Sequence, residues 1–172
     1  MSMNSRLTQL ENEPAFHPLV LVVVPVLALI LQGYVPHLFP HFGLLDLPLL
    51  VVIYFAITLR GPITGTLAGM VIGLVQDAQT GHPIGVNGMA KSIVGYAAAS
   101  IGIRIDVENN ISRMLLAAVF TLGNSLLIYI IERRLLGFDT RWLWLHEAMR
   151  IVVNALVAVV FFWLLDRLKR KG

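Results

Sequence analysis

Seven polar or charged side chains interrupt otherwise apolar stretches of this sequence, and their types and spacing are suited to ion pairing. Together we call them the polar cluster: Asp46, Asp77, Asn87, Lys91, Glu147, Arg150 and Asn154. The last three follow one another at spacings of three and four residues, which places them on one face of a helix. A charge that faces lipid costs roughly 2.5–3.5 kcal/mol, whereas acids and bases that meet in the interior neutralise one another. The pattern therefore predicts an interior cluster that pairs charges or binds a polar group.

Simpler structural roles are alternatives for single members of the polar cluster. Asp46 and Asp77 lie near the ends of apolar stretches, where an acid can cap a helix or reach the headgroups. The long side chains of Lys91 and Arg150 can also extend to the headgroups. These alternatives stay open at the level of the sequence.

No catalytic, metal or cofactor site is predicted. No serine–histidine or paired-acid motif supplies a nucleophile with a base in reach. His37 and His41 have a spacing that suits a metal, but Pro40 lies between them and no third ligand is near. The absence of cysteine from the sequence excludes disulfides and thiolate metal sites.

A stripe of glycines precedes Asp77 at strict four-residue intervals. It consists of Gly61, Gly65, Gly69 and Gly73, and the following apolar stretch carries Gly88 and Gly95. Each glycine in a helix costs roughly 1 kcal/mol relative to alanine in water. In a bilayer, small residues at this spacing let a second helix approach closely. We expect these glycines to pack against another helix, either within the chain or in a partner.

The composition indicates an integral membrane protein. The chain is 57% hydrophobic and 13% charged, and its mean hydropathy is +0.78, which leaves too little polar surface for a soluble globule. The formal net charge is +3, but the basic residues lie at the ends of apolar runs and not in one patch. Nucleic acid is therefore not an expected partner.

The elements that must position these residues are six membrane-spanning helices in a single domain, so the expected fold class is all-α. Apolar runs of about 17–25 residues match the thickness of a bilayer core. The expected spans are residues 18–39, 42–59, 62–78, 86–103, 111–131 and 146–165.

The distribution of basic residues predicts that both termini are cytoplasmic. With the amino terminus inside, the cytoplasmic segments carry Arg6, Arg60, Arg104, Arg113, Arg167, Lys169, Arg170 and Lys171, against Arg133, Arg134 and Arg141 outside. The polar cluster then lies in the outer half of the membrane. The outside arginines belong to residues 132–145, which also hold Trp142 and Trp144. This connection is either an interfacial segment on the outer leaflet or a hydrated loop.

The order of several short motifs resembles the rod shape-determining protein MreD family. The motifs are Asp46-Leu47-Pro48, Arg60-Gly61-Pro62 with the glycine stripe, Gln76-Asp77, the run from Gly81 to Gly88, and Gly95-Tyr96. Length, span count and basic tail agree along the whole chain, while the specific motifs lie in residues 46–99. Lys91 and the Glu147, Arg150 and Asn154 face match no family signature.

The resemblance implies a fold, a location and a set of partners. The fold would be similar to the six-helix substrate-binding components of energy-coupling-factor vitamin transporters, and the location would be the bacterial cytoplasmic (inner) membrane. The implied partner is the single-span protein MreC, and through it the MreB filament, the glycosyltransferase RodA and a class B penicillin-binding transpeptidase. We therefore expect a non-catalytic scaffold of the cell-elongation complex. The alternative is a carrier or binding protein for a small polar solute or lipid headgroup, with the polar cluster as its pocket.

Overall fold

The described part of the chain is entirely helical. The computed structural model describes residues 16–38, 43–103 and 109–168, and no strand occurs among them. The helices are α2 (Pro18–Leu38), α3 (Leu47–Leu59), α4 (Pro62–Thr80), α5 (Val86–Gly102), α6 (Asn110–Ile130) with the π-helical turn η2 (Ile131–Leu135), and α7 (Trp144–Asp166). An α-helix thus occupies each of the six predicted ranges, which confirms the expectation of an all-helical protein with six helices.

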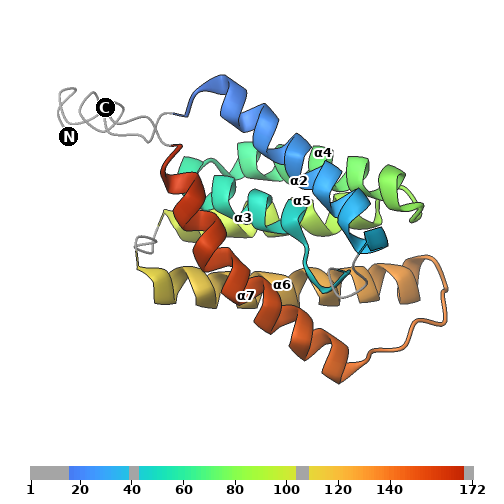
Figure 1. Cartoon of the computed structure of the whole chain (residues 1–172). Coiled ribbons are helices and arrows are strands. Elements are labelled where there is room, and N and C mark those ends of the chain that lie inside the picture. Colours follow the sequence, from blue (N-terminus) through green and yellow to red (C-terminus); the bar gives the residue numbers. More distant parts are fainter. Residues whose placement is uncertain (1–15, 39–42, 104–108, 169–172) are drawn as a thin grey trace, which may run out of the picture.

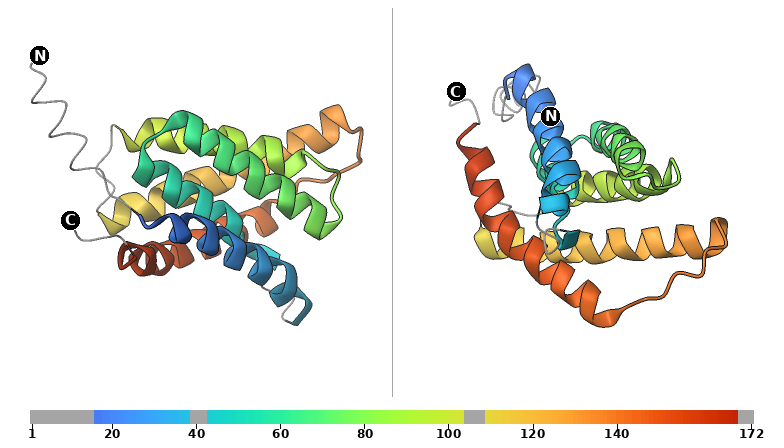
Figure 2. Two further views of the ribbon diagram at one scale, coloured as in Figure 1. Left: turned by 90° about the horizontal axis from the view of Figure 1, so that it is seen from above. Right: turned by 45° about the vertical axis from the view of Figure 1, so that its right-hand side comes forward.

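Helix α3 forms the centre of the bundle (Figures 1 and 2). Every residue from Pro48 to Thr58 is buried. The helix is apolar on all sides, which is the pattern of a helix that other helices surround. It contacts α2, α4, α5, α6 and α7, and it provides the largest share of the hydrophobic core.

Helix α3 begins five residues later than the sequence predicted. The Oδ1 atom of Asp46 accepts a hydrogen bond from the backbone N–H of Leu49 (3.0 Å), so Asp46 is the N-cap. Pro48 lies in the first turn, where a missing N–H is tolerated. The apolar residues before Asp46 extended the predicted run, but Gly43 and Leu44 form a short 3₁₀ turn, and residue 42 lies outside the described residues.

The glycine stripe is covered by α5. Gly65 packs against Gly95, Gly69 against the backbone of Lys91, and Gly73 against the backbone of Asn87. A Cβ atom on Gly65 would lie 2.5 Å from the carbonyl oxygen of Gly95, closer than van der Waals contact allows. The two antiparallel helices therefore meet backbone to backbone, and bulk at these positions would separate them.

Two of the predicted glycines have other surroundings. A Cβ atom on Gly61 would meet only its own turn, at Thr64, so Gly61 is the N-cap of α4 and not part of the helix contact. Gly88 lies within the α4–α5 contact, because a Cβ atom on Gly73 would lie 2.7 Å from the Cα atom of Gly88, but its own Cβ atom would meet the flexible side chain of Leu74 at 3.0 Å. The closest approaches between the backbones of α4 and α5 thus lie at Gly65, Gly69, Gly73 and Gly95.

Helices α6 and α7 pack together and extend away from the rest of the bundle at the end where residues 136–143 connect them (Figure 1). At the opposite end, Arg113 of α6 forms an ion pair with Asp166 of α7, and the hydroxyl of Tyr54 donates to Asp166 (2.9 Å).

Among the described residues, Asn110–Leu135 and Trp144–Asp166 are long and apolar enough to cross a membrane by length and composition. Pro18–Tyr34 and Leu47–Leu59 are shorter apolar helices.

Candidate functional site

A buried ion pair between Asp46 and Lys91 lies at the centre of the candidate site. The Nζ atom of Lys91, on α5, lies 2.9 Å from Oδ2 of Asp46, at the start of α3. The two side chains are 0% and 2% exposed. The same Nζ donates to Oδ1 of Asn87 one turn earlier on α5 (3.1 Å). Because an isolated buried charge is very costly, each of these charges stabilises the other in place.

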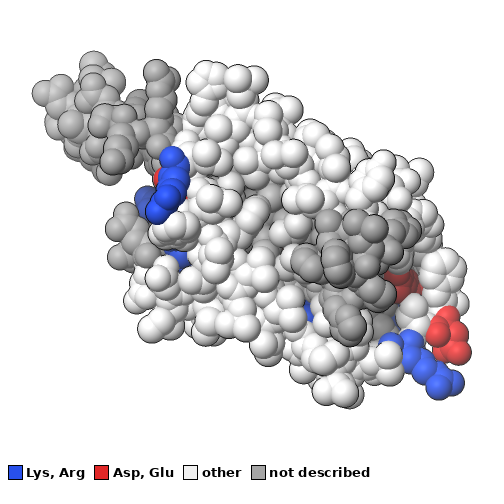
Figure 3. Space-filling view, in the orientation of Figure 1, with Lys and Arg blue, Asp and Glu red and all other residues white. Residues whose placement is uncertain are grey.

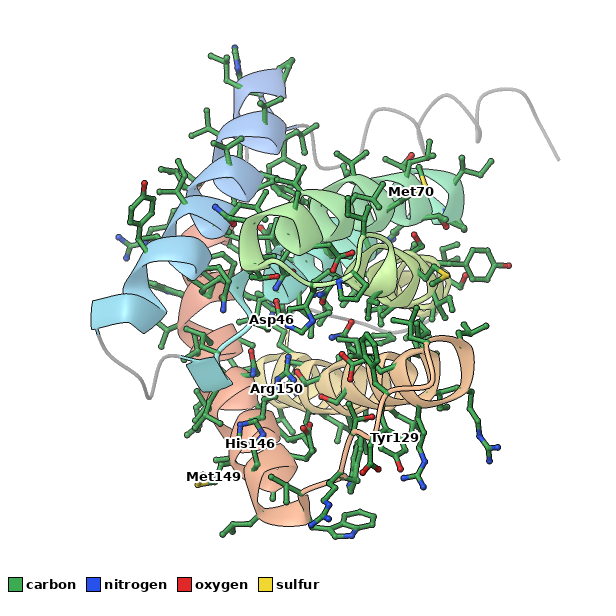
Figure 4. The ribbon with its side chains drawn as sticks, turned by 90° about the vertical axis from the view of Figure 1, so that its right-hand side faces the viewer. Asp46, Met70, Tyr129, His146, Met149 and Arg150 are labelled. Carbon is green, nitrogen blue, oxygen red and sulfur yellow. The ribbon has the colours of Figure 1, made fainter. Side chains whose placement is uncertain are left out.

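Helix α7 contributes a second cation and an amide to the same carboxylate. The Nη2 atom of Arg150 lies 3.5 Å from Oδ2 of Asp46, and Figure 4 shows the two residues facing each other. Oδ1 of Asn154 accepts the backbone N–H of Asp46 (3.0 Å). Its Nδ2 donates to the carbonyl oxygens of Leu44 (2.9 Å) and Arg150 (2.8 Å). Residues more than 100 positions apart are thereby joined around the start of α3.

Asp77 binds the amino-terminal end of α5 and not a cation. Its carboxylate accepts the backbone N–H groups of Gly85 (2.9 Å), Asn87 (3.1 Å) and Gly88 (3.3 Å). These donors stand at the positive end of the helix dipole, where an acid is favourable. Gly85 adopts φ +107°, a left-handed conformation that suits glycine and turns the three amides toward Asp77.

Asn87 joins the two halves of the site. Its Nδ2 donates to Oδ1 of Asp77 (2.8 Å), while its Oδ1 accepts from Lys91. A continuous hydrogen-bonded chain therefore runs from Asp77 through Asn87, Lys91 and Asp46 to Arg150, and links α4, α5, α3 and α7. Figure 3 shows one face of the molecule, on which most of the described surface is uncharged.

Glu147 is the member of the polar cluster that the structure leaves outside this chain. Its Oε1 lies 3.5 Å from Nδ1 of the neighbouring His146. Its Oε2 is buried and has no hydrogen-bond partner among the described residues. It lies in the first turn of α7, three residues before Arg150, but no hydrogen bond or ion pair between the two is found in the described residues.

Sequence reasoning missed Gln32, a second amide that binds the segment before α3. Its Nε2 donates to the carbonyl oxygen of Leu45 (2.9 Å), and its Oε1 accepts the N–H of Leu47 (3.1 Å). Gln32 and Asn154 thus satisfy the backbone on either side of Asp46, from α2 and α7. A lone glutamine within an apolar run was the available signal.

The hydrogen bonds and ion pairs of the site hold helices together. The carboxylate of Asp46 is paired with Lys91 and also faces Arg150, and the carboxylate of Asp77 is stabilised by hydrogen bonds from amides. In the described ranges, no group of three or more His, Cys, Asp or Glu side chains is placed to hold a metal ion. The site therefore connects four helices through groups that bind each other.

The family comparison agrees with this structural character. The family model for rod shape-determining protein MreD matches residues 15–171, nearly the whole chain. The chain belongs to the MreD family. MreD proteins are rod-shape-determining membrane proteins, so the resemblance drawn from the sequence motifs is confirmed. Comparisons with curated proteins and with solved structures gave no match.

Proposed function

We propose that this MreD protein is a non-catalytic scaffold of the cell-elongation complex that binds MreC and helps to position peptidoglycan synthesis. RodA, a class B penicillin-binding transpeptidase and MreB would join it through that complex. The observation that supports a scaffold is that the charged groups bind other groups of the same protein: Lys91 and Asp46 are buried and form an ion pair, and Lys91 also donates to Asn87. A site of this kind fixes the relative positions of helices and presents a stable outer shape to a partner.

The location that we propose is the bacterial cytoplasmic membrane, crossed six times, and large apolar side chains on the outside of the bundle support it. They include Val22, Val26 and Leu31 of α2, Leu67 and Val71 of α4, and Val152, Leu156 and Val160 of α7, each at least 47% exposed. An exposed apolar surface of this extent is favourable in contact with lipid or with another membrane helix. The six-helix fold of the energy-coupling-factor binding components remains our proposal for the architecture.

Co-purification with MreC tests the scaffold. We expect MreC to remain bound when this chain is captured through a tag from a mild detergent extract, in a defined ratio. The control is an unrelated single-span protein expressed at the same level. Capture of both proteins alike, or of neither, would contradict a specific partnership.

The runner-up function is a binding protein for a small polar solute or lipid headgroup. Buried polar atoms without partners, among them Nε of Arg150 and both amide atoms of Asn124, favour it. Native mass spectrometry of the purified protein would then show a bound small molecule in a fixed ratio. Its absence, together with retained MreC, would favour the scaffold.

The membrane topology has a separate test. Because the chain has no cysteine, single cysteines can be placed at Ser2, Gln79 and Gly172. The count of basic residues predicts that both terminal cysteines resist a membrane-impermeant maleimide in intact cells, while Gln79→Cys reacts. Labelling of either terminal cysteine in intact cells would overturn the six-span topology.

A further inference from the structure

Three neighbouring polar side chains on α6 have no visible partner. Thr121, Asn124 and Ser125 lie at spacings of three and four residues, on one face of the helix. They are 0%, 0% and 4% exposed. The hydroxyl oxygens of Thr121 and Ser125 and both amide atoms of Asn124 have no hydrogen-bond partner among the described residues.

The packing of α5 against α6 places this polar face at the depth of the charged chain. Val86 and Ala90 of α5 form a small apolar cluster with Ile131 of η2, the turn that continues α6. An α-helix rises by about 1.5 Å per residue, so Lys91 lies about 7.5 Å along α5 from Val86, and Ser125 lies about 9 Å along α6 from Ile131. The two helices are antiparallel neighbours (Figure 1), so both positions lie at a similar level.

The packing of α6 against α7 also places Asn124 at the level of the charged chain. Arg113 and Asp166 pair at one end. Asn124 follows Arg113 by 11 residues, and Asn154 precedes Asp166 by 12, which corresponds to about 17 and 18 Å of helix. Asn124 therefore lies level with Asn154, which binds the backbone beside Asp46.

Helix α7 adds two more unpartnered groups on the outward side of this level. Nε of Arg150 and Oε2 of Glu147 are buried without a hydrogen-bond partner in the described part of the chain. The unpartnered groups thus include donors and acceptors, and the full charges nearby are of both signs. A charged ligand would not match this balance, whereas a small neutral molecule that donates and accepts would.

We propose that Thr121, Asn124 and Ser125, with Arg150 and Glu147, hold a cluster of bound water molecules between α5, α6 and α7. Buried waters typically make about three hydrogen bonds to polar groups that otherwise lack partners, and polar residues in membrane helices commonly face water-filled space. The water would hydrate the interior beside the Asp46–Lys91 pair. This inference does not depend on the proposed binding of MreC.

Isosteric removal of the polar groups tests the proposal, because the sign of the effect differs between a wet and a dry site. If water satisfies these groups, Thr121→Val and Asn124→Leu each remove a hydrogen-bond partner of the bound water, and each lowers Tm by about 3 °C or more. If the groups are dry and unpartnered, the same changes remove a buried polar atom and raise Tm. Thr66→Val is the matched control, because the Thr66 hydroxyl donates to the carbonyl oxygen of Pro62 in its own helix.

Radiolytic hydroxyl-radical labelling of the unaltered protein provides a second measurement, which also decides the matter if Asn124→Leu does not fold. Radicals form from bound water, so we expect Phe120, 6% exposed and one turn from Asn124, to be oxidised. Ile53 of α3 is 0% exposed, lies among apolar residues and should stay unmodified. A rise in Tm in Thr121→Val, or Phe120 as unreactive as Ile53, would overturn the water cluster.

Discussion

Replacement of Gly69 by leucine is expected to abolish the native packing of α4 on α5. A Cβ atom at this position would lie 2.6 Å from the carbonyl carbon of Lys91 and 3.0 Å from the backbone nitrogen of Ser92. Neither atom can move without displacing α5, and with it the charged chain that passes through Lys91. Overpacking of this kind costs about 1–3 kcal/mol or more. We expect a fall in Tm, a broadened size-exclusion profile in detergent and loss of bound MreC.

Val71→Leu is the control for this substitution. Val71 lies on the same helix, two residues from Gly69 and Gly73, and is 56% exposed. Leucine there should leave Tm nearly unchanged, whereas Gly73→Leu should resemble Gly69→Leu because Gly73 meets the backbone of Asn87. Equal tolerance at all three positions would mean that the glycines face lipid and that the α4–α5 contact is wrong.

Replacement of Lys91 by methionine is the second change with a large expected effect. It leaves the Asp46 carboxylate, 2% exposed, with Arg150 at 3.5 Å as its remaining cation. Removal of one member of a buried ion pair typically destabilises a protein by about 3–5 kcal/mol. The double variant Asp46→Asn with Lys91→Met should lose less stability than the sum of the two single variants, since asparagine still caps α3.

A second double-mutant cycle is the control for the first. Asp77 reaches Lys91 only through Asn87, so the coupling in Tm between Asp77→Asn and Lys91→Met should be smaller than that between Asp46→Asn and Lys91→Met. Additivity in the Asp46–Lys91 cycle would show that the buried pair does not contribute as described. If the protein is instead a carrier, these variants should lose ligand binding while their melting temperatures barely change.

The sequence was sufficient for the helices and for the types of residue in the site, because apolar runs and glycine spacing are local features. The start of α3 was misplaced because the length of the apolar run does not show that Asp46 caps the backbone N–H of Leu49, which sets where the helix begins. The partners of the charged groups were less predictable. Whether Lys91 meets Asp46 or Asp77 depends on how α3 and α5 are rotated and crossed, and no local pattern encodes that rotation.

The composition of residues 132–145 did not predict which contacts this connection makes. Trp142 contacts the rings of Tyr129 and Trp144, and Arg133 donates to the hydroxyl of Tyr129. These contacts order the segment at the end of α6, and we propose that it lies at the outer membrane interface. The sequence shows that the segment contains aromatic residues and arginines, while their contacts with one another depend on how the chain folds back between α6 and α7.

The position of Asn154 has a consequence for how the chain is made. Asn154 belongs to the last helix, yet it supplies hydrogen bonds to Leu44 and Asp46, which precede the second helix. During synthesis, the start of α3 must wait with these backbone groups unsatisfied until about 100 further residues have emerged. Helices α2, α4 and α5 make most of the contacts to α3 and are synthesised before α7. A chain that lacks α7 would therefore still surround much of α3, but it would leave the backbone N–H of Asp46 and the carbonyl oxygen of Leu44 without the hydrogen bonds from Asn154.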